Sequence, residues 1–172
     1  MDSVDRRLID ALRADGRASY AELARSVGLS SSAVHERVSK LESSGVIAGY
    51  RAVVDPTEIG LGVTALIGIE PGENGLDHEI AASLDALPEV ESCYAVAGDE
   101  AFVVKVRVGS VDELHRCLGR LRGISGVART RTTVVLATRF EMRPHLLEPA
   151  PGVITHVAPR PPTRGGATVP PK

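Results

Sequence analysis

Hydrophobic residues recur every three or four positions along the first 47 residues, and this spacing predicts three short helices. The first helix is expected over about 4–14 and the second over 20–27, while the third follows Ser30 and ends at Gly45. The apolar positions that can form their common core are Leu8, Leu12, Leu23, Val27, Val34, Val38 and Leu41. Such a core is marginal by itself, because a domain this small buries little surface relative to the chain entropy that it loses.

Local capping residues mark where these helices begin and end. Asp2 or Ser3 can cap the first helix, and Gly16 is expected to end it in a left-handed conformation. Ser19 and Glu22 have the spacing of a capping box for the second helix. Two short helices joined by a tight turn, the second with polar residues facing outward, are typical of the helix-turn-helix motif. On spacing alone, a plain helical hairpin with a solvated outer face remains the alternative.

The third predicted helix combines an outward polar face with free backbone donors at its N-terminus. Ala33 stands where a capping box would need a carboxylate, so backbone N–H groups are left free there. A helix N-terminus with free N–H groups and neighbouring hydroxyls is suited to holding a phosphate group. The polar residues on or beside this face are Ser30, Ser31, Ser32, His35, Glu36, Arg37, Ser39 and Lys40.

The pattern changes after the third helix. Residues 46–54 predict an extended wing or linker strand, which Asp55 and Pro56 interrupt. From residue 63 onward the expected elements are a strand at 63–70, a helix at 76–87, strands at 90–97 and 101–108, a helix capped by Asp112, and a last strand at 127–140. This β-α-β-β-α-β order is ferredoxin-like, with both helices on one face of a four-stranded antiparallel sheet.

The face of that sheet away from the helices is expected to carry apolar residues as well. Exposed apolar sheet faces are costly in water, so the pattern favours self-association through this face. A monomer in which the N-terminal domain covers the face is the alternative.

The chain is therefore expected to be an α+β protein with two domains, a linker and a tail. We place a helix-turn-helix domain at residues 1–47, an extended linker or wing strand at 48–62, a β-α-β-β-α-β domain at 63–143 and a flexible tail at 144–172. From Pro149 onward the tail holds seven of the eleven prolines, which favours a passive, disordered segment over one that touches DNA.

Composition and charge change this picture only in part. The net charge is −2, and residues 1–50 hold seven Lys and Arg against seven Asp and Glu. A strong non-specific binder of nucleic acid is therefore disfavoured, and basic residues must gather on one face if the domain binds DNA. Cys93 and Cys117 fit no metal-ligand spacing, and such sparse use favours the reducing cytoplasm. The charged N-terminus is unlike a signal peptide, and no apolar run is long enough to cross a bilayer, so we expect no membrane partner.

A series of short stretches follows a recognisable order along the chain. They are Asp5-Arg6 with Leu8-Ile9, Asp15-Gly16-Arg17, Glu22-Leu23-Ala24, Val27-Gly28-Leu29-Ser30, Arg37-Val38, Leu41-Glu42, Gly45-Val46-Ile47, Gly49-Tyr50, Glu89-Val90 and Ala97-Gly98-Asp99. Together they resemble the Lrp/AsnC family of feast/famine regulators, over about residues 2–140. The resemblance implies a winged helix-turn-helix domain that reads double-stranded DNA. It also implies a RAM/ACT-like second domain that forms homodimers, assembles them into octamers and binds an amino acid or a similar small effector.

The resemblance places the DNA contacts on the third helix, and side-chain chemistry divides them. We expect contacts with DNA phosphate groups from Ser30, Ser31, Ser32 and Lys40, and contacts with base edges from His35 and Glu36. A glutamate repels phosphate but can accept a hydrogen bond from a cytosine amino group. Ser39 stands where family members often carry a basic residue. Arg37 is either a further DNA contact or, like its family counterpart, a structural residue tied to a carboxylate.

The resemblance places an effector site at the connection between the second and third strands. Its candidate residues are Ala97, Gly98, Asp99, Glu100 and Ala101. Thr130, Thr132 and Thr133 of the last strand can face the same cleft, with Thr132 as the further candidate, but the sequence does not decide on which side of the sheet they lie. Gly98 allows a close backbone approach, while Asp99 and Glu100 supply the negative charge that an ammonium group needs. Ala101 departs from the family's G-D-x-D pattern, which has an aspartate at this position. A simple hairpin turn is the alternative.

These expectations combine into a transcriptional regulator that is gated by an amino acid and needs no cofactor. An architectural protein that bridges DNA without a ligand is one alternative. An enzyme resembling tetrapyrrole decarboxylases is another, and it is disfavoured because His78, His115 and His145 are scattered without a partnered acid. We therefore expect a regulator rather than an enzyme, with DNA, further copies of the chain and an amino acid as its partners.

Overall fold

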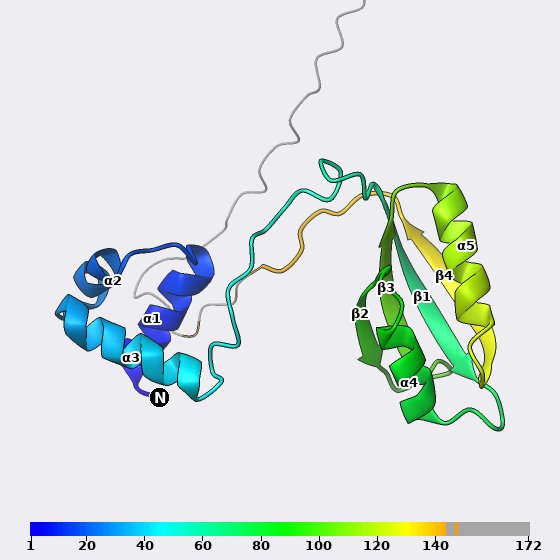
Figure 1. The fold of residues 1–172 in the computed structure, drawn as a ribbon, viewed down its shortest axis with the longest axis horizontal. Helices are drawn as coiled ribbons and strands as arrows, with labels where there is room; N and C mark the ends of the chain where they lie inside the picture. The colour runs from blue at the N-terminus through cyan, green and yellow to red at the C-terminus, as the bar shows by residue number, and fades with distance from the viewer. Residues whose placement is uncertain (144–146, 148–172) are drawn as a thin grey trace, which may run out of the picture. The chain divides into compact units, whose positions relative to one another are not determined.

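Three short helices pack around an aliphatic core at the beginning of the chain (Figure 1). They are α1 (Ser3–Ala14), α2 (Tyr20–Val27) and α3 (Ser31–Ser43), as the hydrophobic spacing predicts. The computed structural model describes residues 1–143 and 147, and it contains two compact units; the first includes Met1–Ala52 and the second is Val53–Thr138. The buried core of the first unit consists of Leu8, Leu23, Ala24, Val27, Val34 and Val38.

Side-chain caps begin each of these helices. Asp2 caps α1 and forms a reciprocal capping box with Asp5, because each carboxylate accepts the other residue's backbone N–H. The predicted capping box at α2 also forms. At α3 the Ser30 hydroxyl accepts a hydrogen bond from the Ala33 backbone N–H at 3.2 Å. The local sequence therefore determines where all three helices begin.

The end of α1 differs from the prediction. Asp15 is the C-cap residue in an extended conformation, and Gly16 does not have the expected positive φ. The Asp15 carboxylate accepts a hydrogen bond from the Arg17 backbone N–H at 2.8 Å, which turns the chain without a left-handed residue. Left-handed glycines do follow the other two helices, at Gly28 (φ 75°) and Gly45 (φ 74°).

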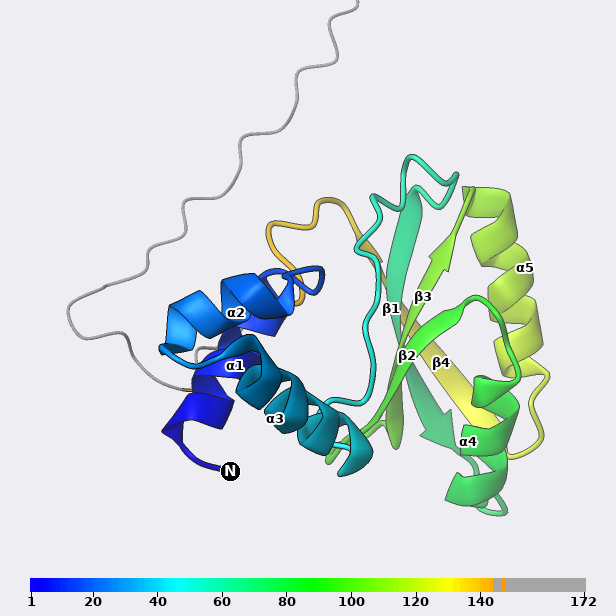
Figure 2. The same ribbon diagram turned by 60° about the vertical axis from the view of Figure 1, so that its left-hand side comes forward.

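The second unit is a four-stranded antiparallel sheet with two helices on one of its faces (Figures 1 and 2). Its elements follow in the predicted order: β1 (Val63–Pro71), α4 (Asp77–Asp85), β2 (Val90–Ala95), β3 (Phe102–Val108), α5 (Val111–Arg122) and β4 (Val127–Val135). The strands are arranged β2-β3-β1-β4, so β1 and β3 are central and β2 and β4 form the edges. The core between sheet and helices includes Ile67, Ile69, Ile80, Leu84, Val104, Val106 and Leu121.

Three further local expectations, all for residues after α3, are wrong. Ser110, not Asp112, caps α5, and its hydroxyl accepts a hydrogen bond from the Glu113 backbone N–H at 3.2 Å. The last strand ends at Val135 rather than near residue 140. Residues 46–54 form no wing strand, because within the described residues no other strand lies beside them to satisfy their backbone groups.

The face of the sheet away from the helices carries both charged and apolar residues, so the prediction of apolar residues there is confirmed, although the face is not wholly apolar. Residues alternate along β3, so Val104 points to the core while Lys105 and Arg107 point to the other face. Both cations pair with Glu91 of β2, at 3.0 Å from Lys105 and 2.7 Å from Arg107. Leu66, Val103 and Tyr94 lie on this face as well, where Tyr94 is 56% and Leu66 40% exposed. Self-association through this face therefore stays a prediction.

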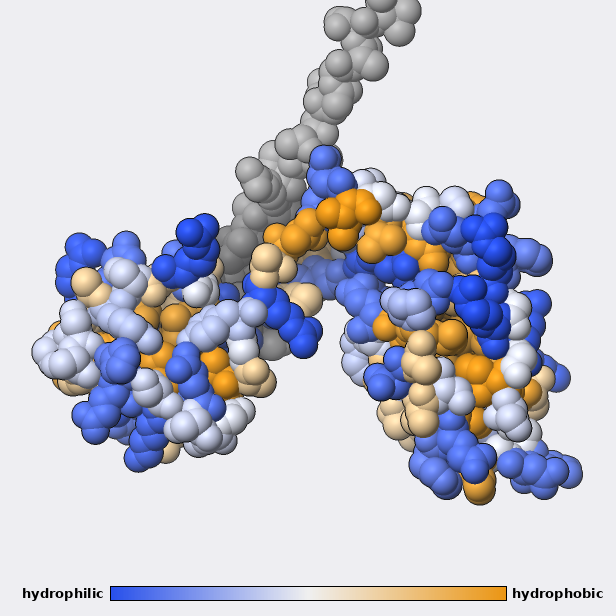
Figure 3. Space-filling view, in the orientation of Figure 1, coloured by the Kyte–Doolittle hydropathy of each residue, from blue (hydrophilic) through white to orange (hydrophobic). Residues whose placement is uncertain are grey.

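Hydrophilic side chains cover most of the visible surface of each unit in Figure 3. Among the described residues, no helix is both long and apolar enough to span a bilayer. The flexible tail predicted at 144–172 lies, apart from Leu147, outside the described residues.

Candidate DNA-binding face and effector loop

The N-terminus of α3 presents the three serines of the predicted phosphate site. Ser30 uses its hydroxyl to cap the helix, and this hydroxyl also lies 3.1 Å from that of Ser32. Ser31 and Ser32 are exposed, and the first turn of α3 contains no acidic side chain. The structure therefore brings hydroxyl groups and a positive helix end together without a competing carboxylate in that turn.

The side chains of His35 and Arg37 leave α3 on opposite sides of the helix. Two residues along a helix differ by about 200° in direction, so the two side chains lie on opposite flanks. The His35 ring meets the ring of Tyr20, from the first turn of α2, edge to face with centroids 5.0 Å apart. The sequence analysis missed Tyr20, because only the packing of α2 against α3 brings the two rings together.

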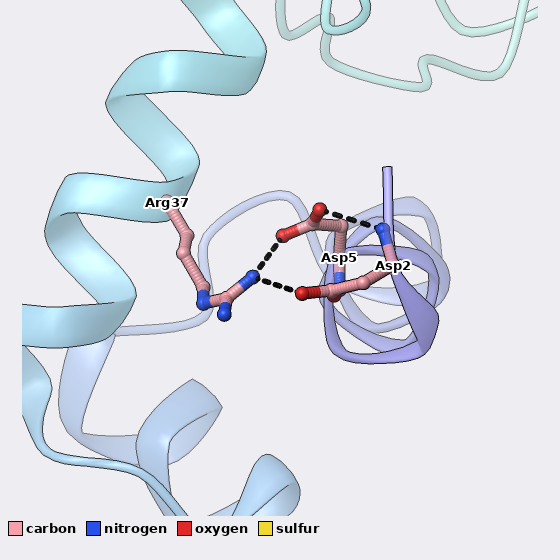
Figure 4. Close-up of polar contacts among 3 residues, drawn as sticks. All are labelled: Asp2, Asp5 and Arg37. Carbon is pink, nitrogen blue, oxygen red and sulfur yellow. Dashed lines mark hydrogen bonds and ion pairs between the residues drawn. The ribbon is translucent and has the colours of Figure 1, made fainter.

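Arg37 is bound by two carboxylates from α1 (Figure 4). Its Nη1 atom lies 2.7 Å from Asp2 Oδ2 and 2.7 Å from Asp5 Oδ1. These are the same two carboxylates that form the capping box of α1, each using its second oxygen for the arginine. The hydrogen bond from the Asp5 backbone and the contact with Arg37 lower the pKa of Asp2, and the two aspartates raise the pKa of Arg37.

Of the two roles that the sequence left open for Arg37, the geometry supports the structural one. Two carboxylates neutralise its charge and hold it toward α1, so it ties the third helix to the first. A groove on this flank is lined by Asp2, Asp5, Glu36, Arg37 and Lys40, among others. Glu36 and Lys40 are exposed and Ser39 is half-buried. Lys40 is therefore the cation of α3 that remains suited to a phosphate contact.

The predicted effector loop connects β2 to β3 as a tight turn. The Val96 backbone N–H donates to the Ala101 carbonyl at 3.0 Å, and the Ala101 N–H donates to the Ile69 carbonyl at 2.9 Å. Gly98 has a φ of 156°, and Asp99 is exposed. The turn is thus fastened to the central strand β1 at Ala101, with Ala97, Gly98 and Asp99 at its open end.

Glu100 lies against the backbone of β1 at Gly68. A Cβ atom on Gly68 would come within 2.7 Å of Glu100 Cγ, so the glycine leaves the space that this side chain fills. Glu100 Oε1 then lies 3.2 Å from Arg131 Nη1 on β4. The sequence alone does not indicate that Gly68 and Arg131 lie side by side, because only the register of β1 with β4 pairs them across the sheet.

Thr132 does not join this group. It is paired with Ile67, which is fully buried beneath the helices, so its side chain points to the helix-covered face. Its neighbour Thr130 lies on the same side, where its hydroxyl accepts a hydrogen bond from Arg122 of α5 at 3.2 Å. Arg131 points to the opposite face, beside Glu100. Thr132, which the sequence offered as a candidate, and Arg131, which lies beside Glu100, are therefore adjacent in β4 but on opposite faces of the sheet.

Other chemistry in the described residues is sparse. No group of three or more His, Cys, Asp or Glu side chains there could hold a metal ion. The two cysteines are unpaired thiols, and burial raises the pKa of both Cys93 and Cys117. The higher pKa keeps these thiols protonated and disfavours a nucleophilic role.

Comparison with known proteins matches each unit to a family domain. Residues 1–42 match the AsnC-type helix-turn-helix domain, and residues 63–144 match the Lrp/AsnC ligand binding domain. The HTH-type transcriptional regulator LrpA of Mycobacterium tuberculosis is 44% identical over 146 residues, which cover 85% of this chain and 97% of the relative. Regulatory protein AsnC of Escherichia coli is 35% identical over 138 residues, covering 79% of this chain and 90% of AsnC.

A solved structure of a family member is similar to this chain over most of its length. The solved structure of the feast or famine regulatory protein of M. tuberculosis, complexed with L-methionine, superimposes with a TM-score of 0.80 at 44% identity, covering 84% of this chain and 98% of that chain. These relatives are transcriptional regulators rather than enzymes. The two domain matches in this order, together with the helix-turn-helix and the four-stranded sheet, show that the chain belongs to the Lrp/AsnC family of DNA-binding transcriptional regulators.

Proposed function

We propose that this regulator works as a homo-oligomer whose DNA binding or assembly responds to an amino acid or a related small molecule. One observation carries the proposal: the similar M. tuberculosis regulator forms a complex with L-methionine, and this chain covers 98% of it. The match of residues 63–144 to a ligand-binding domain supports the same conclusion. The regulator would act in the cytoplasm, on the DNA of the nucleoid.

In the proposed DNA complex, α3 enters the major groove. The phosphate contacts are assigned to Ser30, Ser31, Ser32 and Lys40, and the base contacts to His35 and Glu36, with Ser39 beside them. The exposed hydroxyls at the helix start and the exposed Lys40 side chain support this division. Arg37 holds α3 in position and does not itself contact the DNA.

Self-association is proposed to give homodimers that assemble into octamers. A dimer presents two recognition helices to successive major grooves, which lie roughly 34–36 Å apart. Support comes from apolar side chains in the segments before β1 and after β4, because Val53 is 95% exposed and Leu136 is 97% exposed. Exposed apolar groups gain free energy when another copy covers them.

The proposed effector site is the turn formed by Ala97, Gly98, Asp99, Glu100 and Ala101. A free amino acid carries an ammonium group and a carboxylate, so its site needs an acidic group and a set of N–H donors. Asp99 is exposed at the turn, and Gly98 leaves the backbone accessible there. Thr132 points to the other face of the sheet and is not part of this site.

Selection of bound sequences from a random DNA pool, with and without the twenty standard amino acids, tests the proposal. We expect enrichment of a pseudo-palindromic site and a change in its occupancy with at least one amino acid. Light scattering of the same samples follows oligomeric state. Long, periodic footprints that no amino acid alters would overturn the gating proposal and support an architectural DNA-bridging protein instead.

A further inference from the structure

We propose that Arg131 binds the effector's carboxylate and that Glu100 is an internal carboxylate which competes with the effector for this arginine. The inference rests on the proposed function, and it specifies how the effector loop is regulated. It is carried by three elements that meet at one point: the loop before β3, Gly68 of β1 and Arg131 of β4.

The backbone holds Glu100 in place. The next residue, Ala101, donates its N–H to the Ile69 carbonyl at 2.9 Å, so the loop is attached to β1 directly beside Gly68. The Glu100 side chain lies over this glycine and is only 20% exposed. Its carboxylate is thereby presented to Arg131, which is paired with Gly68 across the β1–β4 ladder.

Arg131 is well suited to exchange one carboxylate for another. Its side chain is 64% exposed, and its ion pair with Glu100 uses Nη1 at 3.2 Å. A guanidinium group offers five N–H donors in a planar fork that matches a carboxylate. Because the Arg131 side chain is exposed, water screens its charge and weakens the ion pair. An effector carboxylate can therefore replace Glu100 without a large loss of stability.

The neighbouring pair on the same face provides a matched comparison. Arg129 is two residues earlier on β4 and faces Glu70 of β1, with its Nε atom 3.7 Å from Glu70 Oε2. Both partners of this second pair belong to regular strands, and neither belongs to the effector loop. Arg129 therefore has the same charge, strand and sheet face as Arg131 but lacks the contact with the loop.

The test measures amino-acid binding to the full chain and its variants. A thermal-shift screen of the twenty standard amino acids selects the strongest binder, and calorimetry then compares this amino acid with its methyl ester, which lacks the carboxylate. The variants are Arg131→Gln, Glu100→Gln and Gly68→Ala, with Arg129→Gln as the control. Gly68→Ala keeps both charges but pushes Glu100 away, because its Cβ would meet Glu100 Cγ at 2.7 Å.

We expect Arg131→Gln to weaken binding of the amino acid at least tenfold, the scale of a lost hydrogen bond to a charged group. The acid and its methyl ester should bind this variant equally, whereas the unmodified chain should prefer the acid. Glu100→Gln should tighten binding about twofold to fivefold by removing the competitor. Gly68→Ala should tighten it in the same direction, and Arg129→Gln should leave it unchanged.

Two results would overturn the inference while leaving the proposed function intact. One is wild-type affinity for the acid in Arg131→Gln. The other is weaker binding in both Glu100→Gln and Gly68→Ala, which would make Glu100 a partner of the effector's ammonium group. If Arg131→Gln fails to fold, the two variants that predict tighter binding still decide the question. If no amino acid binds the unmodified chain, the proposed function itself fails.

Discussion

Each unit of this regulator holds an arginine against carboxylates from another element, and the two contacts differ in construction. Arg37 of α3 meets two aspartates, both at 2.7 Å, and its side chain is 35% exposed. Arg131 of β4 meets one glutamate at 3.2 Å, and its side chain is 64% exposed. The first contact joins two helices that share a small core, whereas the second lies on the face of the sheet that points away from the larger core.

The difference follows from what else the carboxylates do. Asp2 and Asp5 also cap α1, so hydrogen bonds to the helix backbone hold their carboxylates independently of Arg37. Glu100 instead lies over Gly68, in a loop that is attached to β1 at Ala101. A cation between two fixed carboxylates acts as a structural tie, whereas a cation beside one displaceable carboxylate can change partners. An arginine–carboxylate contact thus ties two helices together in the first unit and, in our proposal, makes the second unit responsive.

Removal of core volume should affect the first unit most, and it is the largest effect that we predict. Leu8 is fully buried in the core of α1, α2 and α3, and Leu8→Ala should cost about 2–5 kcal/mol of unfolding free energy. A small helical unit has little stability in reserve, so it should unfold and DNA binding should be lost. Amide hydrogen exchange should show loss of protection in α1, α2 and α3 but not in the sheet.

The matched control is Leu84→Ala, which removes the same atoms from the fully buried core of the sheet unit. This variant should keep protected helices in the first unit. If Leu8→Ala instead leaves the three helices protected, the small core is more stable than its size implies, and the tie through Arg37 is not needed to explain its order.

Contacts between residues that lie close in sequence could be predicted, and contacts between residues that lie far apart in sequence could not. The capping box of Ser19 with Glu22 spans three residues, and it is present as expected. Arg37 and Asp2 are 35 residues apart, and their contact depends on how α1 packs against α3. Gly68 and Arg131 meet only through the strand register. Because side chains alternate along a strand, the sequence without the register could not decide that Thr132 faces the helices and Arg131 the other side of the sheet.

Salt dependence of DNA binding should separate the two basic residues of α3. Lys40→Ala should reduce the slope of log affinity against log salt by about one, because one phosphate contact is lost. Arg37→Gln should leave this slope unchanged, since two aspartates already neutralise the arginine. Affinity is measured by fluorescence anisotropy across a salt series. An unchanged slope in Lys40→Ala, or a reduced one in Arg37→Gln, would exchange the roles that we assign to them.

Acid should weaken the ion pair between Asp2 and Arg37, and this is the smallest effect on stability that we predict. Folding lowers the pKa of Asp2 below its ordinary value of 3.8, through the hydrogen bond from the Asp5 backbone and the contact with Arg37. A carboxylate with a lowered pKa in the folded state stabilises that state at pH values above its unfolded pKa, and this stabilisation is lost as pH falls through the folded pKa. The melting temperature of the first unit should therefore decrease as the pH is lowered below about 4. Asp2→Asn should melt lower at neutral pH and lose less on acidification, as followed by calorimetry. If the variant and the unmodified chain respond to acid equally, Asp2 contributes nothing to the tie, and Asp5 alone holds Arg37.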